Sequence, residues 1–114
     1  ATNALLGVQV TAIAELIGML RRNGADARKI MGIIAGTAVW SPYAQRAIGA
    51  LLSGEAPVMF PVELVEKDFG YALEAAGSPD AAPTIAAARS VFRRGMDEGL
   101  GDANLTSVVA LFRK

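Results

Sequence analysis

The sequence predicts an all-α fold, a compact bundle of six helices in a single domain that spans residues 1–114. Three observations support this prediction. The 114 residues suit one domain, and 53% of them are apolar, which is enough to build a core. Residues that cap or end helices recur at intervals of about one helix along the whole chain. No segment alternates apolar and polar residues for long enough to indicate a β-strand.

The first helix should span about residues 2–22 and end at Asn23-Gly24, a pair that suits a left-handed cap. Its first charge is Glu15, and apolar residues lie on all of its sides, which implies burial all round. Small residues form one narrow stripe along it, where another backbone could approach closely: Gly7, Thr11, Ala14 and Gly18. This helix is therefore either central in the bundle or covered partly by something outside this chain.

Local signals place the next two helices and the loop that follows them. Asp26 is a suitable N-cap for a helix that ends near Gly36. Ser41-Pro42 fits the N-cap and first position of a helix that ends at Ser53-Gly54. The loop from residue 54 to residue 59 leads into Val58-Met59-Phe60, three consecutive large apolar residues. These three either close the bundle core or insert into a partner.

Proline and glycine mark the remaining helices. Pro61 opens a fourth helix, which ends at Gly77-Ser78-Pro79. A fifth helix begins at Asp80 or Thr84 as its N-cap and runs to about Glu98. The glycines at positions 99 and 101 end it, and two residues are candidate caps of a last helix that runs through position 112: Asp102 and Asn104.

Composition excludes several kinds of chemistry and partner. Eleven basic and eleven acidic residues cancel, and no basic stripe carries interleaved aromatics, so we expect no binding to nucleic acid. The chain has no cysteine and no histidine, which removes disulfides, thiolate chemistry, Cys/His zinc sites and histidine triads, and we expect no metal site. Any acid–base chemistry must come from Lys, Asp, Glu or Tyr. The absence of cysteine fits a cytoplasmic protein.

Residues 1–20 come closest to a membrane span, yet five polar residues interrupt them: Thr2, Asn3, Gln9, Thr11 and Glu15. The run ends in Arg21-Arg22. Its length and polarity indicate a buried helix of a soluble protein, and we expect no association with a membrane. The start of the chain lacks a basic segment, so we expect no signal peptide.

The stretch FPVELVEKDFGY, residues 60–71, places two charges between apolar residues. On a helical wheel one set of side chains forms a core face: Val62, Val65, Phe69, Ala72, Leu73 and Ala76. A separate stripe combines aromatic, cationic and acidic side chains: Phe60, Leu64, Lys67, Asp68 and Tyr71. One interpretation is a solvated face, on which Lys67 pairs with Glu63 and Asp68 sits in water. The aromatic neighbours favour the other interpretation, half of an active site.

Several motifs, taken in order, resemble one family over essentially all 114 residues. They are Asn3, the pair Ala14-Glu15, NGAD at 23–26, FPVELVEKDFGYAL at 60–73 and GLGD at 99–102. The chain resembles the C-terminal helical domain of the β-hydroxyacid dehydrogenases, which include hydroxyisobutyrate dehydrogenase and tartronate semialdehyde reductase. The resemblance implies the fold of the 6-phosphogluconate dehydrogenase C-terminal domain.

The resemblance also implies a function. The chain would be part of a two-domain oxidoreductase that transfers a hydride between NAD or NADP and a small hydroxy acid or semialdehyde. In that family an N-terminal Rossmann domain binds the cofactor, and the helical domain closes the cleft and sets the dimer. Asn3 would match the asparagine that binds the substrate. Lys67 would match the lysine that reaches the cofactor. Phe60 and Asp68 would match residues that line the cleft. A helix N-cap is the structural alternative for Asn3.

The chain departs from the family pattern in three ways. It has no GxGxxG fingerprint, so the Rossmann domain is missing from it. The catalytic lysine of the family stands four residues before the asparagine, which places it two residues before Ala1. We therefore expect no catalytic residue within the chain, no bound cofactor and no activity of the chain alone. Many members of the family have an acidic residue at the position of Asn104. Because asparagine is neutral, we expect no ion pair at this position in this chain.

A second hypothesis is a non-catalytic helical module for protein interaction or dimerisation. Its partner surface would be the first helix together with Val58-Met59-Phe60. Under either hypothesis we expect self-association to a homo-dimer, because an uncovered first helix should leave a large apolar patch. The expected partners are a small hydroxy acid, the missing Rossmann domain and a second copy of the chain.

Overall fold

The computed structural model describes residues 1–113, which form five α-helices and two 3₁₀-helices. The α-helices are α1 (Thr2–Arg22), α2 (Ala27–Ile34), α3 (Pro42–Ser53), α4 (Val62–Ala76) and α5 (Pro83–Asp97). The 3₁₀-helices are η1 (Pro79–Ala81) and η2 (Leu105–Phe112). Within residues 1–113 the β-structure is limited to an isolated bridge between positions 61 and 104. The all-α prediction is confirmed, and η2 is the sixth helix.

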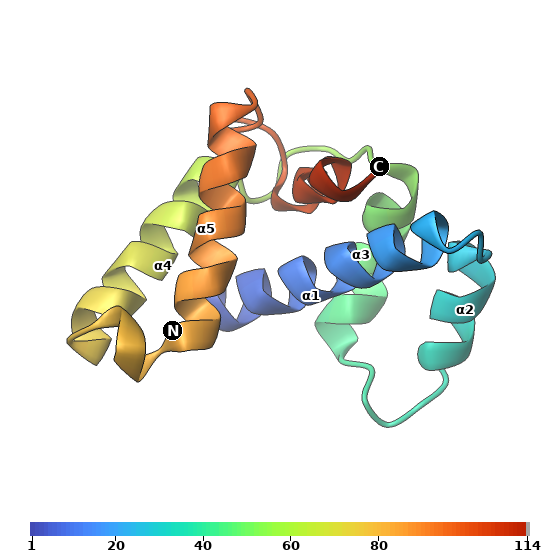
Figure 1. Ribbon diagram of the computed structural model, residues 1–114, viewed down its shortest axis with the longest axis horizontal. Helices are drawn as coiled ribbons and strands as arrows, with labels where there is room; N and C mark the ends of the chain where they lie inside the picture. Colours follow the sequence, from blue (N-terminus) through green and yellow to red (C-terminus); the bar gives the residue numbers. More distant parts are fainter. Residues whose placement is uncertain (114) are drawn as a thin grey trace.

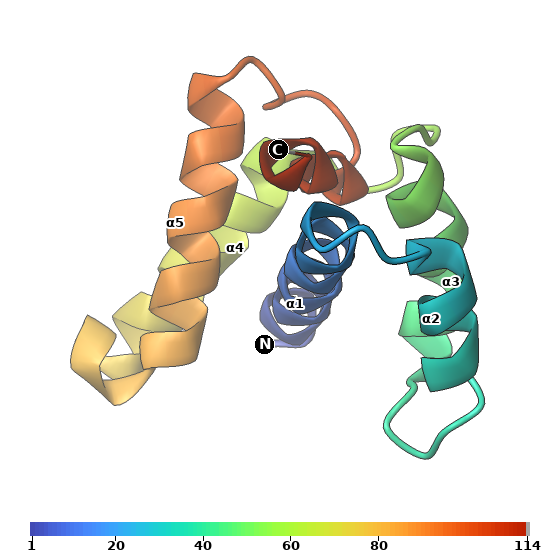
Figure 2. The same ribbon diagram turned by 45° about the vertical axis from the view of Figure 1, so that its right-hand side comes forward.

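The first helix, α1, is the central element of the fold. It contacts α2, α3, α4, α5 and η2. Figures 1 and 2 show α4 and α5 together on one side of α1, α2 and α3 toward the other side, and η2 above it. The radius of gyration is 13.7 Å, close to the value of about 13 Å for a compact chain of this length.

The small-residue stripe of α1 is buried inside the bundle. Gly7 lies beneath the ring of Phe69 and beside Val65 of α4, and a Cβ at Gly7 would collide with both side chains. Gly18 lies against η2, where a Cβ would come within 2.6 Å of the Phe112 carbonyl oxygen. The stripe therefore allows α4 and η2 to approach α1 closely, and both of these elements belong to this chain.

The opposite side of α1 is apolar but uncovered. Its spacing puts four side chains on one stripe, which we call the open stripe: Leu5, Ala12, Leu16 and Met19. Leu5 is 64% exposed, Leu16 39% and Met19 44%. The interpretation of α1 as the central helix is thus confirmed, and cover by something outside this chain stays a prediction.

Within residues 1–113, α1 is the one helix whose length and composition would allow it to cross a bilayer. Eight of its residues are buried in the fold: Ala4, Gly7, Val10, Thr11, Ile13, Ala14, Ile17 and Gly18. Packing against five other elements accounts for much of its apolar character.

The caps predicted for α2 and α3 are confirmed. The Asp26 side chain accepts a hydrogen bond from the Lys29 amide at 3.1 Å, and Ser41 Oγ accepts one from the Ala44 amide at 2.9 Å. Gly54 ends α3 with φ of 80°, a left-handed conformation that side chains other than glycine rarely adopt. Short-range signals therefore set the bounds of both helices.

Both caps predicted for α5 are wrong. Its N-cap is Ala82, and no side chain caps the helix. Asp80 lies within η1, and Thr84 is already the second residue of α5. Pro83 occupies the first position, where its fixed φ suits a helix and its missing N–H needs no acceptor. The proline therefore starts the helix one residue before the predicted threonine cap.

A distant segment caps the N-terminus of α4. Pro61 is the N-cap residue and offers no side-chain acceptor. Instead, the Val62 amide donates to the Ala103 carbonyl, and the Glu63 amide donates to the Gly101 carbonyl, both at 2.9 Å. The glycine-rich turn before η2 thus satisfies two of the backbone donors that the start of a helix leaves unpaired.

Asn104 holds the loop before α4 and does not cap η2 with its side chain. This buried side chain accepts hydrogen bonds from the Met59 and Phe60 amides, at 2.9 and 3.2 Å, and donates to Thr106 Oγ1 at 2.8 Å. The Leu105 amide donates to the Phe60 carbonyl at 2.7 Å. Asn104 is the N-cap residue of η2, one of the two predicted, but its side chain makes no capping bond because it bonds to the loop and to Thr106.

The pair α4–α5 is joined by an aromatic contact and a cluster of charges. The rings of Phe69 and Phe92 meet edge to face, with centroids 5.3 Å apart. Glu66 of α4 accepts from Arg89 at 2.5 Å and from Arg93 at 3.2 Å. These contacts fix the rotation of α4 and so determine which of its side chains face away from the core.

Replacing Gly7 by alanine should destabilise the fold by about 1–3 kcal/mol, because the added methyl group overlaps Phe69 and Val65. Gly32→Ala is the matched control. Gly32 lies within α2 with open space around it, so alanine there should stabilise the protein by about 0.5–1 kcal/mol. Urea unfolding followed by circular dichroism measures both variants. Similar effects at the two positions would contradict close packing at Gly7.

Candidate functional site

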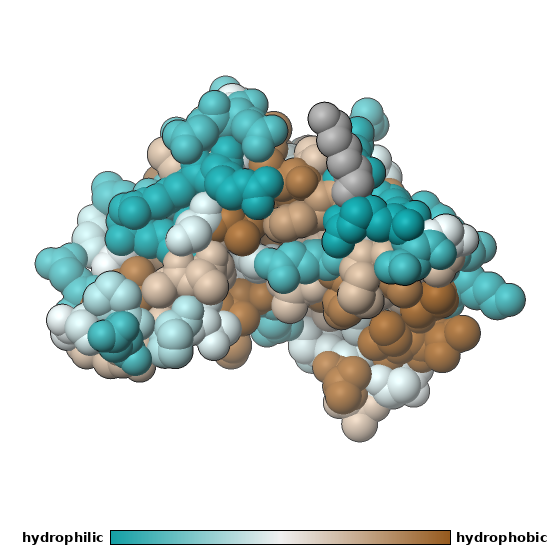
Figure 3. Space-filling view, viewed as in Figure 1, coloured by the Kyte–Doolittle hydropathy of each residue, from teal (hydrophilic) through white to brown (hydrophobic). Residues whose placement is uncertain are grey.

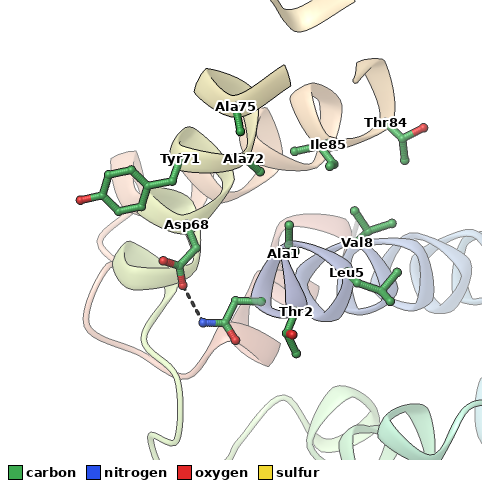
Figure 4. A pocket seen from close by; sticks show the side chains of 12 residues that line it. Ala1, Thr2, Leu5, Val8, Asp68, Tyr71, Ala72, Ala75, Thr84 and Ile85 are labelled. Atoms are coloured by element: carbon green, nitrogen blue, oxygen red, sulfur yellow. Dashed lines mark hydrogen bonds between the residues drawn. The ribbon is translucent and has the colours of Figure 1, made fainter. Parts of the chain in front are cut away.

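The start of α1 and the middle of α4 meet at a hydrogen bond. Asn3 Nδ2 donates to Asp68 Oδ2 at 2.7 Å, and both side chains are half-buried. Figure 4 draws this bond as a dashed line at Asp68. Asn3 lies inside α1 and does not cap it, and Asp68 is not simply solvated, so the structural alternatives for these two residues are wrong. The structure brings two of the predicted site residues together.

Asp68 fixes the orientation of the Asn3 amide. A carboxylate accepts hydrogen bonds and does not donate them, so the nitrogen of the amide must face it. The Asn3 Oδ1 atom is then directed away from Asp68, and no other described residue bonds to the Asn3 side chain. The pair therefore presents acceptor oxygens, which suit a ligand that donates a hydrogen bond.

A hollow of about 750 Å³, which we call the trough, extends from this bond between α1 and the pair α4–α5 (Figure 4). Beyond the bond its walls are mostly apolar, with contributions from three helices: Leu5, Val8, Tyr71, Ala72, Ala75, Thr84 and Ile85. Asp68 carries the one charged side chain among the lining residues. This volume and this composition are typical of sites for small organic molecules.

Lys67 lies beside the trough and not in it. It is exposed and lines a shallower hollow with Tyr71 and Arg89, and Tyr71 borders the trough as well. Lys67 forms no ion pair with any of residues 1–113, so the expected pairing with Glu63 is absent. Its ammonium group is available to an anionic ligand.

Phe60 is 38% exposed and lines a third hollow, of about 510 Å³, between α3 and the loop before α4. Tyr43 and Arg46 of α3 line it too, and burial raises the pKa of the Tyr43 phenol. Sequence reasoning singled out neither residue, because only the folded chain brings α3 against the loop. The predicted residues thus line three different hollows, and the structure does not bring Phe60 to the bond between Asn3 and Asp68.

The exposed side of α4, together with the loop before it, offers a cation and two aromatic rings to a ligand. Lys67 is unpaired, and the rings of Phe60 and Tyr71 are accessible, which suits a negatively charged ligand with planar groups. The sequence carries no GxGxxG fingerprint. No cluster of acidic residues within residues 1–113 could hold a metal ion.

Comparison with known proteins gives a family and a fold. Residues 1–112 match the family described as NAD-binding of NADP-dependent 3-hydroxyisobutyrate dehydrogenase. The structure is similar to a crystal structure of 3-hydroxyisobutyrate dehydrogenase from Salmonella typhimurium, with a TM-score of 0.84 and 21% sequence identity. The similarity covers 97% of this chain and 39% of that one, and at this identity it shows the fold alone. Among curated proteins, none matches.

The bond between Asn3 and Asp68 should appear as a coupling energy of about 0.5–1.5 kcal/mol in a double-mutant cycle with Asn3→Ala and Asp68→Ala. The cycle removes the effect of each alanine on helix propensity. Its control pairs Asn3→Ala with Lys67→Ala, which should be additive because these two side chains do not bond. Urea unfolding measures all the variants. Additivity for Asn3 and Asp68 would contradict the bond.

Proposed function

Because this chain belongs to the family of NAD-binding domains of NADP-dependent 3-hydroxyisobutyrate dehydrogenase, we propose that it is the helical domain of a larger NAD(P)-dependent oxidoreductase. The family match and the fold confirm the resemblance predicted from the sequence. In this proposal the larger protein transfers a hydride between C4 of the nicotinamide and the carbonyl or hydroxyl carbon of a small hydroxy acid or semialdehyde. The observation that supports it most is the bond between Asn3 and Asp68 at the mouth of the trough.

Each site residue then has a role that its position supports. Asn3 binds a substrate oxygen, and Asp68 holds the Asn3 amide in one orientation. Lys67 binds the cofactor with its unpaired charge, and Phe60 lines the cleft. When bound, the cofactor supplies the hydride chemistry. In this proposal the lysine that transfers the proton would stand two residues before Ala1, one helical turn from Asn3 and so on the same side of the helix.

A Rossmann domain forms the other wall of the proposed site. Large apolar side chains are exposed along the loop before α4 and along α4 itself: Val58, Met59, Phe60, Leu64 and Tyr71. Met59 is 78% exposed and Val58 53%. Apolar groups gathered in this way are typical of a surface that packs against another domain. The choice between NAD and NADP belongs to that domain, and we place the whole protein in the cytoplasm.

We also propose that the chain forms a homo-dimer through the open stripe of α1. Ile33 and Val39 continue its apolar surface, with exposed fractions of 63% and 81%. Leu16 and Val39 line the same hollow. Figure 3 shows apolar side chains gathered over the lower part of α2 and the loop that follows. A non-catalytic dimerisation module is the alternative function, and the same surface supports it.

The 114-residue chain alone should not oxidise NADH or NADPH with a small semialdehyde, because it lacks both the phosphate-binding fingerprint and the lysine. In the larger protein, Lys67→Gln should raise the KM for the cofactor about tenfold with kcat little changed, since one contact to a charged group is lost. Lys29→Gln, on the exposed side of α2, is the control and should change neither constant. Turnover by the isolated chain, or an unchanged cofactor KM, would contradict the proposal.

Light scattering should give an average mass that rises with protein concentration, because burying the open stripe removes exposed apolar surface from water. Leu16→Glu should shift the chain to the monomer by placing a charge in the centre of the interface. Ala110→Glu adds the same charge at an exposed position of η2 and should leave the association unchanged. A strictly monomeric chain at high concentration would refute the dimer.

A further inference from the structure

We infer that the trough beside the Asn3–Asp68 bond is a subsite for a ligand that carries a hydroxyl group and an extended alkyl substituent. This inference rests on the proposed function and narrows its substrate class. It selects hydroxy compounds with a chain of several carbons over those with a single methyl group.

The polar end of the trough selects the head group. With its nitrogen committed to Asp68, the Asn3 amide presents Oδ1 to the ligand, and Asp68 adds a second acceptor oxygen. No Lys or Arg side chain is among the residues that line the trough. A hydroxyl group can donate to these oxygens, and the negative charge of Asp68 repels an acid group placed directly beside it. The trough therefore holds the hydroxyl end of a substrate.

The apolar part of the trough selects the substituent. Asp68, Ala72 and Ala75 occupy successive turns of α4, so the α4 wall runs about 10 Å from the polar end. Leu5 and Val8 form the facing wall on α1, as Figure 4 shows. A volume of about 750 Å³ far exceeds the space that a methyl group fills. A short hydroxy acid would leave these apolar walls against water, while an alkyl chain would cover them.

The test is an NMR titration of the ¹⁵N-labelled chain with 2-butanol, 2-hexanol and 2-octanol. Each added methylene group should tighten binding about fourfold, as burial of apolar surface predicts. Amides along both walls, at Leu5, Val8 and Ala72, should shift together. 2-Methoxyoctane lacks the donor and should bind several-fold more weakly than 2-octanol. Equal affinity along the alcohol series would overturn the inference.

Two substitutions localise the binding to the trough. Ala75 is exposed on α4 and lines the far end, so Ala75→Phe should fill this space and abolish the gain from a longer chain without disturbing the core. Ala110→Phe places the same side chain on η2, outside the trough. This variant should bind the alcohols with the same affinities as the unmodified chain. A gain with chain length in Ala75→Phe equal to that of the unmodified chain would refute the assignment.

The outcomes separate this inference from the proposed function. In the larger protein, kcat/KM should rise with the alkyl length of the hydroxy acid. Turnover limited to short hydroxy acids would refute the inference and leave the oxidoreductase proposal intact. If the chain binds alcohols with an affinity that depends on their length, but the larger protein turns over no hydroxy acid, the oxidoreductase proposal is refuted instead. Loss of alcohol binding as the chain associates would show that a second copy fills the trough, and this also overturns the inference.

Discussion

The contact between Gly7 and the ring of Phe69 sets the geometry on which the rest of the structure depends. It allows α1 to approach α4 so closely that a methyl group would not fit between them. Asn3 stands one helical turn before Gly7 on the same side of α1, and Asp68 precedes Phe69 in α4. The close approach therefore brings Asn3 Nδ2 within 2.7 Å of Asp68 Oδ2. A larger residue at position 7 would separate the helices at the place where the candidate site is built, so one packing constraint serves both the core and the site.

Most of the fold was predictable because its signals are local. Asp26, Ser41 and Gly54 act within a few residues of their own positions, and the helices they bound are the predicted ones. At the start of α5 the error was local, because Pro83 takes the first position, but the other unpredicted contacts join distant segments. The start of α4 is capped by carbonyl groups of residues 101 and 103, and Asn104 bonds to the loop at residues 59 and 60. These bonded positions lie 38 to 45 residues apart, so no spacing in the sequence could reveal them.

The sequence singled out candidate site residues, whose roles stay predictions, but only part of their arrangement. The wheel separated the core face of α4 from the mixed stripe, and the structure keeps that separation: Val62, Val65 and Phe69 are buried, while Leu64 and Tyr71 are exposed. The bond from Asn3 to Asp68 depends on the crossing of two helices, which a wheel drawn for one helix does not contain. Lys67 lines a hollow that shares Tyr71 with the trough, whereas Phe60, in the loop before α4, lines a separate hollow with residues of α3.

The chemistry of the described surface explains how a domain of an NAD-binding family can lack a phosphate-binding glycine loop. No Lys or Arg side chain is among the residues that line the trough, which offers acceptor oxygens and apolar walls. The hollow beside it offers one unpaired lysine, which is too little charge for the two phosphates of a dinucleotide. Under the proposed function, these groups orient a hydroxyl group and one end of the cofactor. The groups that hold phosphates and acid groups would then belong to the Rossmann domain, and binding energy from two domains would bring the hydride donor to the carbon that accepts it.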